Sequence, residues 1–400
     1  MSLRLLLLLP QWPRDPASGA ARSLSTTSRL LARNGITVRA LATTATEGSR
    51  SINVPQELIE AGISSSVQRG RTGHRSRPEL FYDDHGVPHR LLDVAHRKAF
   101  AWEETLGREF DLMFDEELAS FKPDVMLTFG GTAGDIRRRQ RARRQGVRVV
   151  FGLRNNGYLD AHPEFWESID EILTPSRFLT DQYRTRQHIE STPIPSPFDI
   201  NDVIAEDRDP IFFTMVNPSP EKGLMLFARL AEECSKRRPD IPFLVVESRG
   251  SGGMLVRVGL AAGFDLRRHE NIMLSSAVPQ PRDIYLAAKA ILAPSFCEES
   301  FGRVAAEAML NGIPPLCSNR GGMTEICSGA GFVLDVPAEY NEHTPHPVAA
   351  RVVTPWIALI ERLEDDAAFL AAESVKAKQA GRRYHPDVLV PRYLDFFAKL

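Results

Sequence analysis

Short apolar runs alternate along the chain with longer stretches in which apolar residues recur at helical spacing. In the first half, such runs predict strands at 3–9, 37–42, 125–129, 147–153 and 170–174, with helices at 18–33, 91–119, 135–145 and 176–187. The segment from about 47 to 80 is polar and rich in Arg and Ser, and we expect loops with weak strands there. This alternation is typical of crossover units and a parallel sheet.

A stretch without periodicity, 191–210, interrupts this pattern, and its clustered Pro and Asp residues predict a domain boundary. A second series follows, with strands expected at 211–216, 243–247, 271–274, 290–293, 314–318 and 331–334, and helices at 221–236, 281–288, 301–310 and 322–327. The chain beyond about 346 is expected to be helical. The sequence therefore predicts an α/β fold of two doubly wound halves facing across a cleft, with ligands beyond the carboxyl ends of the strands.

Length and charge restrict the class of function. The 400 residues suffice for two or three domains, and 49 basic against 51 acidic residues predict no nucleic-acid partner. The four cysteines form no C-x-x-C pair, which argues against a zinc knuckle or a disulfide framework and fits reduced cytoplasmic thiols. We interpret Cys297 as a small buried filler rather than a nucleophile. The apolar run 5–9 is short for a signal peptide, and no later run is long enough to span a bilayer.

One stretch near three quarters of the chain combines carboxylates with a helix start. Glu299 and Glu307 stand eight positions apart, and Ser300 is expected to cap the helix between them. Three backbone amides would lack partners within the helix and would favour an anion. They belong to Phe301, Gly302 and Arg303. Because carboxylates only accept hydrogen bonds, the pair suits a ligand with hydroxyl groups on both sides of a phosphate, as in a nucleotide sugar. The alternative is a surface helix that carries two glutamates by chance.

Several motifs together resemble the donor site of retaining GT-B glycosyltransferases, above all glycosyltransferase family 4. They are PS at 294–295, ESFG at 299–302, EAM at 307–309, GIP at 312–314, GG at 321–322 followed by Glu325, VNPSPEKG at 216–223, PSRF at 175–178 and PIPSPFD at 193–199. The resemblance spans nearly the whole chain and is strongest from 210 to 335. It implies a GT-B fold, with an acceptor-side domain of residues 1–203, a donor-binding domain of residues 204–384, and a final helix, 385–400, that returns to the first domain.

The resemblance also implies roles for single residues. Lys222 would bind the donor diphosphate as a point charge, with Gly223 giving it room, and Gly19 would face the diphosphate from the first domain unless it serves only as a tight strand-to-helix turn. Glu307 would accept hydrogen bonds from the ribose, and Glu299 from the donor sugar. The amides of Phe301 and Gly302 would hold phosphate or sugar.

Some positions depart from the family pattern. An arginine commonly precedes the lysine, but Asn217 and Ser219 stand in its place here, and Arg249 is the alternative source of charge. A histidine often follows a strand of the first domain and points at the sugar, and here Arg154 or Asn155 would take that role.

The activity implied is transfer of a sugar from a nucleoside-diphosphate sugar to an acceptor hydroxyl, with retention of configuration and without a metal or other cofactor. Acceptors would be glycans, as in polysaccharide biosynthesis, lipid-linked sugars or small molecules. Two alternatives stay open: a nucleotide-sugar-binding pseudo-transferase or partner subunit, and a nucleotide-sugar epimerase of the same fold. The basic segment 137–148 is interpreted as a solvated helix face, with weak contact to a membrane surface as the alternative, so that the protein would be cytoplasmic or peripheral at the inner membrane surface.

Overall fold

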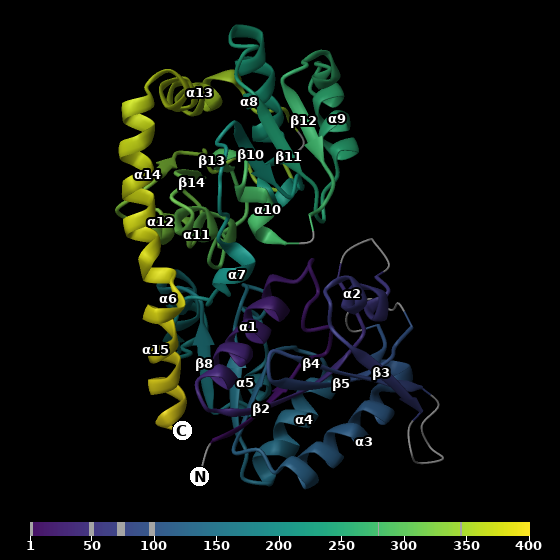
Figure 1. The fold of residues 1–400 in the computed structure, drawn as a ribbon. Helices are drawn as coiled ribbons and strands as arrows, with labels where there is room; N and C mark the ends of the chain where they lie inside the picture. The colour runs from purple at the N-terminus through teal and green to yellow at the C-terminus, as the bar shows by residue number, and fades with distance from the viewer. Residues whose placement is uncertain (1–2, 48–51, 70–76, 96–100, 279, 345) are drawn as a thin grey trace. The chain divides into compact units, whose positions relative to one another are not determined.

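The computed structural model describes residues 3–47, 52–69, 77–95, 101–278, 280–344 and 346–400. Contacts within the chain divide it into two compact units (Figure 1). The first comprises Met1–Pro175, Thr180–Pro197 and Leu389–Leu400, and the second comprises Ser176–Leu179 and Phe198–Val388. Each is described by itself below.

A nine-stranded sheet forms the core of the first unit, in the order β3-β4-β5-β2-β1-β6-β7-β8-β9. The strands are β1 (Arg4–Leu8), β2 (Thr37–Thr43), β3 (Ser65–Arg69), β4 (Pro78–Asp84), β5 (Val87–Leu92), β6 (Val125–Thr128), β7 (Arg148–Gly152), β8 (Glu171–Thr174) and β9 (Thr192–Pro193). All neighbours are parallel except β4, which is antiparallel to β3 and β5. The central strand β1 is an unbroken run of buried leucines, as expected for a parallel strand covered on both faces.

The helices of this unit are α1 (Gly19–Arg33), α2 (Val54–Glu60), α3 (Glu103–Phe121), α4 (Ala133–Arg144), α5 (Pro163–Glu167), most of α6 (Arg177–Gln187) and most of α15 (Pro386–Ala398). Several arginines of α4 contact other residues of the first unit, and two of them, Arg138 and Arg141, bind carboxylates of α3, along which α4 lies (Figure 1). Their contacts join Arg138 to Glu103 and Asp111, Arg139 to the Gly130 carbonyl, Arg141 to Asp115, and Arg143 to Asp170. These pairs favour a structural role over membrane contact.

One prediction for the first unit was wrong, and one was incomplete. The helix expected at 91–119 begins only at Glu103, because Leu91 and Leu92 pair with β2 as the end of β5. The segment 47–80 holds α2, β3 and the start of β4, beside residues outside the described ranges. The feature that was overlooked is a hairpin between β4 and β5, whose two-residue turn, His85-Gly86, has positive φ at both positions.

The second unit is built on a six-stranded parallel sheet in the order β12-β11-β10-β13-β14-β15. The strands are β10 (Phe212–Val216), β11 (Phe243–Val246), β12 (Ile272–Ser275), β13 (Ala288–Ala293), β14 (Pro315–Ser318) and β15 (Phe332–Leu334). The helices are α7 (Ile200–Val203), α8 (Leu224–Arg237), α9 (Gly252–Ala261), α10 (Pro281–Tyr285), α11 (Arg303–Leu310), α12 (Met323–Ile326), α13 (Ala350–Asp365) and α14 (Ala367–Gly381). Helix α9 was not predicted, because its glycine-rich start reads as a loop.

Successive residues of β13 face opposite sides of this sheet and separate two hydrophobic clusters. Ala290 and Leu292 join the cluster under α8, α9 and α13, whereas Ile291 and Ala293 join the cluster under α10, α11, α12 and α14. Helices therefore cover both faces of the sheet. The strand order reverses between β10 and β13, and the crevice beyond their carboxyl ends is where sheets of this kind bind ligands.

Candidate functional site

The loops that follow β10 and β13 touch through their backbones at this reversal point. The Glu221 carbonyl accepts hydrogen bonds from the amides of Phe296, at 3.0 Å, and Cys297, at 3.1 Å. Gly223 has φ +78°, and a Cβ atom there would lie 1.8 Å from the Pro294 carbonyl oxygen. Glycine is therefore required by both the conformation and the close approach. This contact fixes the side chains that the two loops carry.

Lys222 and Glu299, one from each loop, form an ion pair with Nζ 2.5 Å from Oε1. Ser295 Oγ donates a second hydrogen bond to the same Oε1 at 2.8 Å. Burial alone would lower the pKa of the Lys222 ammonium, but the Glu299 carboxylate outweighs it and the pKa is raised. The ammonium therefore stays charged, and its side chain keeps 30% of its surface exposed. A charged, partly open lysine on a loop at the carboxyl edge can meet an anionic ligand.

Helix α11 begins two residues later than predicted, at Arg303 instead of Phe301. Its N-cap is Gly302, with φ +98°, and not Ser300. The Ala306 amide is the first to bond back, to the Gly302 carbonyl at 3.2 Å, so the amides of residues 303–305 precede the first bond of the helix. Glycine is needed at 302 because of its positive φ and because a Cβ would lie 2.6 Å from the Met323 sulfur. The amides without a partner in the helix thus start at Arg303 rather than at Phe301.

Glu307 is almost completely buried, at 5% exposure, and both of its carboxylate oxygens have protein partners. Arg303 Nη2 donates to Oε1 at 2.9 Å, and the Tyr285 hydroxyl donates to Oε2 at 2.7 Å. The Arg303 guanidinium also lies over the Phe198 ring, 4.7 Å from its centre. Phe301 is buried and packs its ring on Phe198 and Tyr384, so its side chain belongs to the core.

The positions that replace the usual arginine shape the loop after β10. Asn217 has φ +61°, and its Oδ1 accepts a hydrogen bond from the Gly250 amide at 2.9 Å. Ser219 is buried, and its Oγ has no hydrogen-bond partner within the described part of the chain. Arg249 is exposed on the neighbouring loop. Asn217 thus has a structural role, since asparagine tolerates this backbone region well.

Glu325, the third carboxylate of the motif region, accepts a hydrogen bond from the start of helix α6. Its Oε2 accepts from the Phe178 amide in the first turn of α6 at 3.2 Å. Ser176, just before α6, donates to the Ser300 carbonyl at 2.5 Å, and the Gly322 amide donates to the Glu299 carbonyl at 2.6 Å. The PSRF motif therefore anchors on the loop that carries Glu299, within the second unit.

Three expected site residues lie in the first unit. Gly19 begins α1, whose cap Ser18 accepts from the Ala21 amide and donates to Glu47 Oε1 at 3.0 Å. The Glu47 carboxylate adds negative charge at this helix end, which disfavours a phosphate there and favours the tight-turn interpretation of Gly19. Arg154 and Asn155 follow β7: Arg154 is buried, and Asn155 is exposed with Oδ1 on the Gly157 amide at 2.8 Å. Their roles stay predictions.

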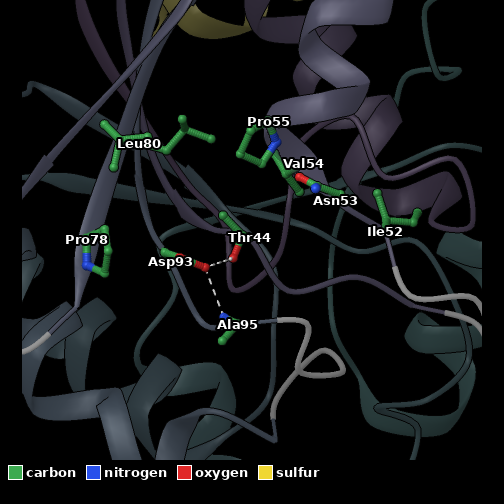
Figure 2. Close-up of a pocket in the computed structure, with 10 residues that line it drawn as sticks. Thr44, Ile52, Asn53, Val54, Pro55, Pro78, Leu80, Asp93 and Ala95 are labelled. Carbon is green, nitrogen blue, oxygen red and sulfur yellow. Dashed lines mark hydrogen bonds between the residues drawn. The ribbon is translucent and has the colours of Figure 1, made fainter.

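A cavity of about 180 Å³ opens in the first unit, in a region with no predicted site residue (Figure 2). Pro78 and Leu80 of β4 lie on one side, and residues 52–55 at the start of α2 lie on the other. Thr44 and Asp93, which follow β2 and β5, are joined by a hydrogen bond of 3.2 Å, and Asp93 also accepts from the Ala95 amide at 2.9 Å. The lining is mainly apolar, with one half-buried carboxylate.

Cys297 should react slowly with alkylating reagents, because burial and the nearby Glu299 carboxylate raise the pKa of its thiol to about 12. At pH 8 about one thiol in ten thousand would be ionised, and the thiolate is the reactive form. Mass spectrometry of the iodoacetamide-treated protein should show modification at least about a hundredfold slower than in the denatured chain, which serves as the control. Rapid labelling of the folded protein would contradict this.

Within the described ranges, His, Cys, Asp and Glu side chains form no group of three or more that could hold a metal ion. No helix of the described residues has the length and apolar character needed to cross a membrane.

Two residues that donate hydrogen bonds to the carboxylates of the site were not among the predicted site residues. They are Ser295, which donates to Glu299, and Tyr285, which donates to Glu307. Ser295 lies two residues after the end of β13, and its place at the carboxyl end of a strand was a signal that could have identified it. Tyr285 comes from the short helix α10, 22 positions before Glu307, and no motif marks it.

Residues 196–341 match the family described as glycosyl transferases group 1. The lipopolysaccharide 1,2-N-acetylglucosaminetransferase of Salmonella typhimurium is 27% identical over 230 residues, which cover 52% of this chain and 57% of that protein. The match therefore spans little more than half of each.

Solved structures resemble the whole chain. Alr3699/HepE of Anabaena, in complex with UDP and glucose, has a TM-score of 0.67 at 16% identity, over 99% of this chain and 100% of that one. Sucrose-phosphate synthase of Thermosynechococcus elongatus has a TM-score of 0.66 at 14% identity, over 99% and 98%. The catalytic domain of starch synthase IV of Arabidopsis thaliana, bound to ADP and acarbose, has a TM-score of 0.64 at 12% identity, over 98% and 99%. At these identities the likeness concerns the fold, which is GT-B as predicted.

Proposed function

We propose that this protein is a retaining, metal-independent glycosyltransferase of family 4, which moves a sugar from a nucleoside-diphosphate sugar to an acceptor hydroxyl. The observation that carries the proposal is the Lys222–Glu299 pair at the strand-order reversal of the second sheet, inside the segment that matches glycosyl transferases group 1. A cation beside a helix start suits the diphosphate, and a carboxylate beside the cation suits the sugar.

Each side chain then has one task. Lys222 would bind the diphosphate and give up part of its contact with Glu299. The amides at the start of α11 would bind the diphosphate as well. Both hydrogen bonds to Glu299 end on Oε1, so Oε2 is open to a sugar hydroxyl as far as the described residues go. Glu307 would accept from the ribose, because each carboxylate oxygen can take a second hydrogen bond.

The reaction would follow from position and charge. The acceptor oxygen bonds to the anomeric carbon on the face that the diphosphate leaves, the bond from that carbon to the phosphate oxygen breaks, and the acceptor proton passes to a phosphate oxygen. Lys222 and the helix amides stabilise the charge that builds on the leaving diphosphate. Glu299 is poorly suited to act as a nucleophile, because Lys222 and Ser295 engage its carboxylate.

The expected partners are drawn from the same chemistry. Structures of Alr3699/HepE contain UDP or UDP-glucose, and starch synthase IV contains ADP, which makes UDP and ADP sugars the first donors to test here. The matched relative transfers N-acetylglucosamine to lipopolysaccharide, which favours a glycan or lipid-linked acceptor. We place the protein in the cytoplasm or at the inner surface of the membrane.

A thermal-shift screen of nucleotide sugars tests the proposal. One nucleotide among UDP, ADP, GDP and dTDP sugars should raise the melting temperature by about 5 °C at a hundredfold excess over its Kd. Chelator should leave this shift and the turnover unchanged, and NMR should find retained anomeric configuration in the product. No shift with any of the four nucleotides, or an inverted product, would contradict the proposal.

A further inference from the structure

The Tyr285 hydroxyl makes a buried contact with Glu307. Tyr285 is the last residue of α10, has no exposed surface, and donates to Glu307 Oε2 at 2.7 Å, whereas its next acceptor, the Val304 carbonyl, is 3.5 Å away. It belongs to the hydrophobic cluster that packs α10 against α11 and β13. A phenol in such packing has little freedom, so the direction of this hydrogen bond is set by the core.

Arg303 and Tyr285 make different kinds of interaction with the Glu307 carboxylate. Arg303 lies one turn before Glu307 on the same helix, has 20% of its side chain exposed, and supplies the positive charge that a buried carboxylate needs. Tyr285 adds no charge. A neutral hydroxyl on the opposite oxygen fixes how the carboxylate is turned, because the carboxylate must satisfy one donor at each oxygen.

We propose that Tyr285 is a positioning residue that turns Glu307 so that its two oxygens meet the 2′- and 3′-hydroxyls of the donor ribose. Each oxygen already accepts one hydrogen bond and can accept another, so a fixed carboxylate matches a pair of neighbouring hydroxyls. Selectivity for ribose over deoxyribose then depends on Tyr285, although it touches no part of the ligand. This inference rests on the proposed function, since it requires a nucleoside diphosphate in this site.

The test is calorimetry of the full-length protein with UDP, ADP, GDP and dTDP, followed by the 2′-deoxy and 3′-deoxy analogues of the tightest ribonucleotide. The unmodified protein should prefer the ribonucleotide by about ten- to a hundredfold, since a site built to bond a hydroxyl rejects ligands without it. In Tyr285→Phe this preference should fall by about three- to tenfold, while the affinity for the deoxy analogues changes less.

Two further variants separate positioning from simple loss of stability. Tyr393→Phe is the matched control, because Tyr393 is equally buried and donates its hydroxyl to the Ile194 and Pro195 carbonyls in the first unit. The Tyr393→Phe variant should have a lower melting temperature than the unmodified protein and the same preference for ribose. In the Glu307→Ala background, Tyr285→Phe should leave the remaining preference unchanged, because no acceptor is then left at position 307 for Tyr285 to position.

The outcomes are distinct. Equal losses for ribonucleotide and deoxynucleotide in Tyr285→Phe would overturn the inference, and so would a Glu307→Ala background in which Tyr285→Phe still changes the ratio. If the protein binds a nucleoside diphosphate without preferring ribose, Glu307 does not read the ribose and the inference is again wrong. If none of the four nucleotides binds, the proposed function itself fails. Should Tyr285→Phe not fold, Glu307→Ala alone still tests the inference, because an unchanged preference for ribose in that variant would overturn it.

Discussion

Lys222→Ala is expected to weaken the binding of the donor nucleoside diphosphate by about ten- to a hundredfold, which corresponds to the loss of one hydrogen bond to a charged group. Lys222 lies 2.5 Å from Glu299 and is the cation of the two touching loops at the carboxyl edge of the second sheet. Its removal takes away a positive charge and leaves the Glu299 carboxylate, which is 13% exposed, with Ser295 as its remaining hydrogen-bond donor. The exposed carboxylate charge would then repel the diphosphate. Calorimetry measures the effect directly.

The double variant Lys222→Ala/Glu299→Ala separates these two causes. Removing the carboxylate as well should restore part of the affinity, because the repulsion disappears while the attraction stays lost. Glu299→Ala alone should bind the nucleoside diphosphate nearly as well as the unmodified protein but turn over at least about a hundredfold more slowly, since its task is at the sugar.

Lys236→Ala is the matched control for Lys222. Lys236 also pairs with a glutamate of the second unit, Glu232, at 2.8 Å, but 54% of the Lys236 side chain is exposed and Glu232 keeps His269 as a second partner. Its loss should change neither affinity nor turnover. If Lys222→Ala binds the nucleotide as tightly as Lys236→Ala does, the diphosphate is not held at these loops and the site assignment is wrong.

The place of Lys222 and Glu299 at the carboxyl edge of the second sheet could be predicted from the sequence because each residue follows an apolar strand, whereas their contact is a finding of the structure. Parallel strands end at one edge, and the order of the sheet makes β10 and β13 neighbours, so both loops come together. Tyr285 could not be predicted in this way. It reaches Glu307 from α10, a five-residue helix with a weak pattern, and only the packing of the core places its hydroxyl.

Predictions failed where local turn chemistry overrode an apolar pattern. Ser300 is a good capping residue by type, but the positive φ of Gly302 starts α11 two residues later. In the first unit, Leu91 and Leu92 fit a helical pattern, yet the His85-Gly86 turn commits them to a hairpin strand. In both cases a glycine with positive φ decided the backbone path, and its sequence signal is a single residue.

Gly223→Ala is expected to destabilise the second unit by about 3–5 kcal/mol. Positive φ with a Cβ atom costs about 1–2 kcal/mol, and the added carbon would overlap the Pro294 carbonyl, which belongs to the backbone and can move only if the loop after β13 moves. The melting temperature should fall by roughly 10 °C. Since the same loop carries Glu299, nucleotide affinity should fall as well, measured below the melting range.

Gly263→Ala separates the cost of positive φ from the cost of the clash with the Pro294 carbonyl. Gly263 also has positive φ, at +87°, but no atom lies within 4 Å of the position that its Cβ would take. This variant should lose only about 1–2 kcal/mol, with unchanged nucleotide affinity, because it bears the conformational cost without the clash. Equal melting temperatures for the two variants would mean that the loops after β10 and β13 do not approach closely at Gly223. Lys222 and Glu299 would then lack the rigid support on which their role as a donor site depends.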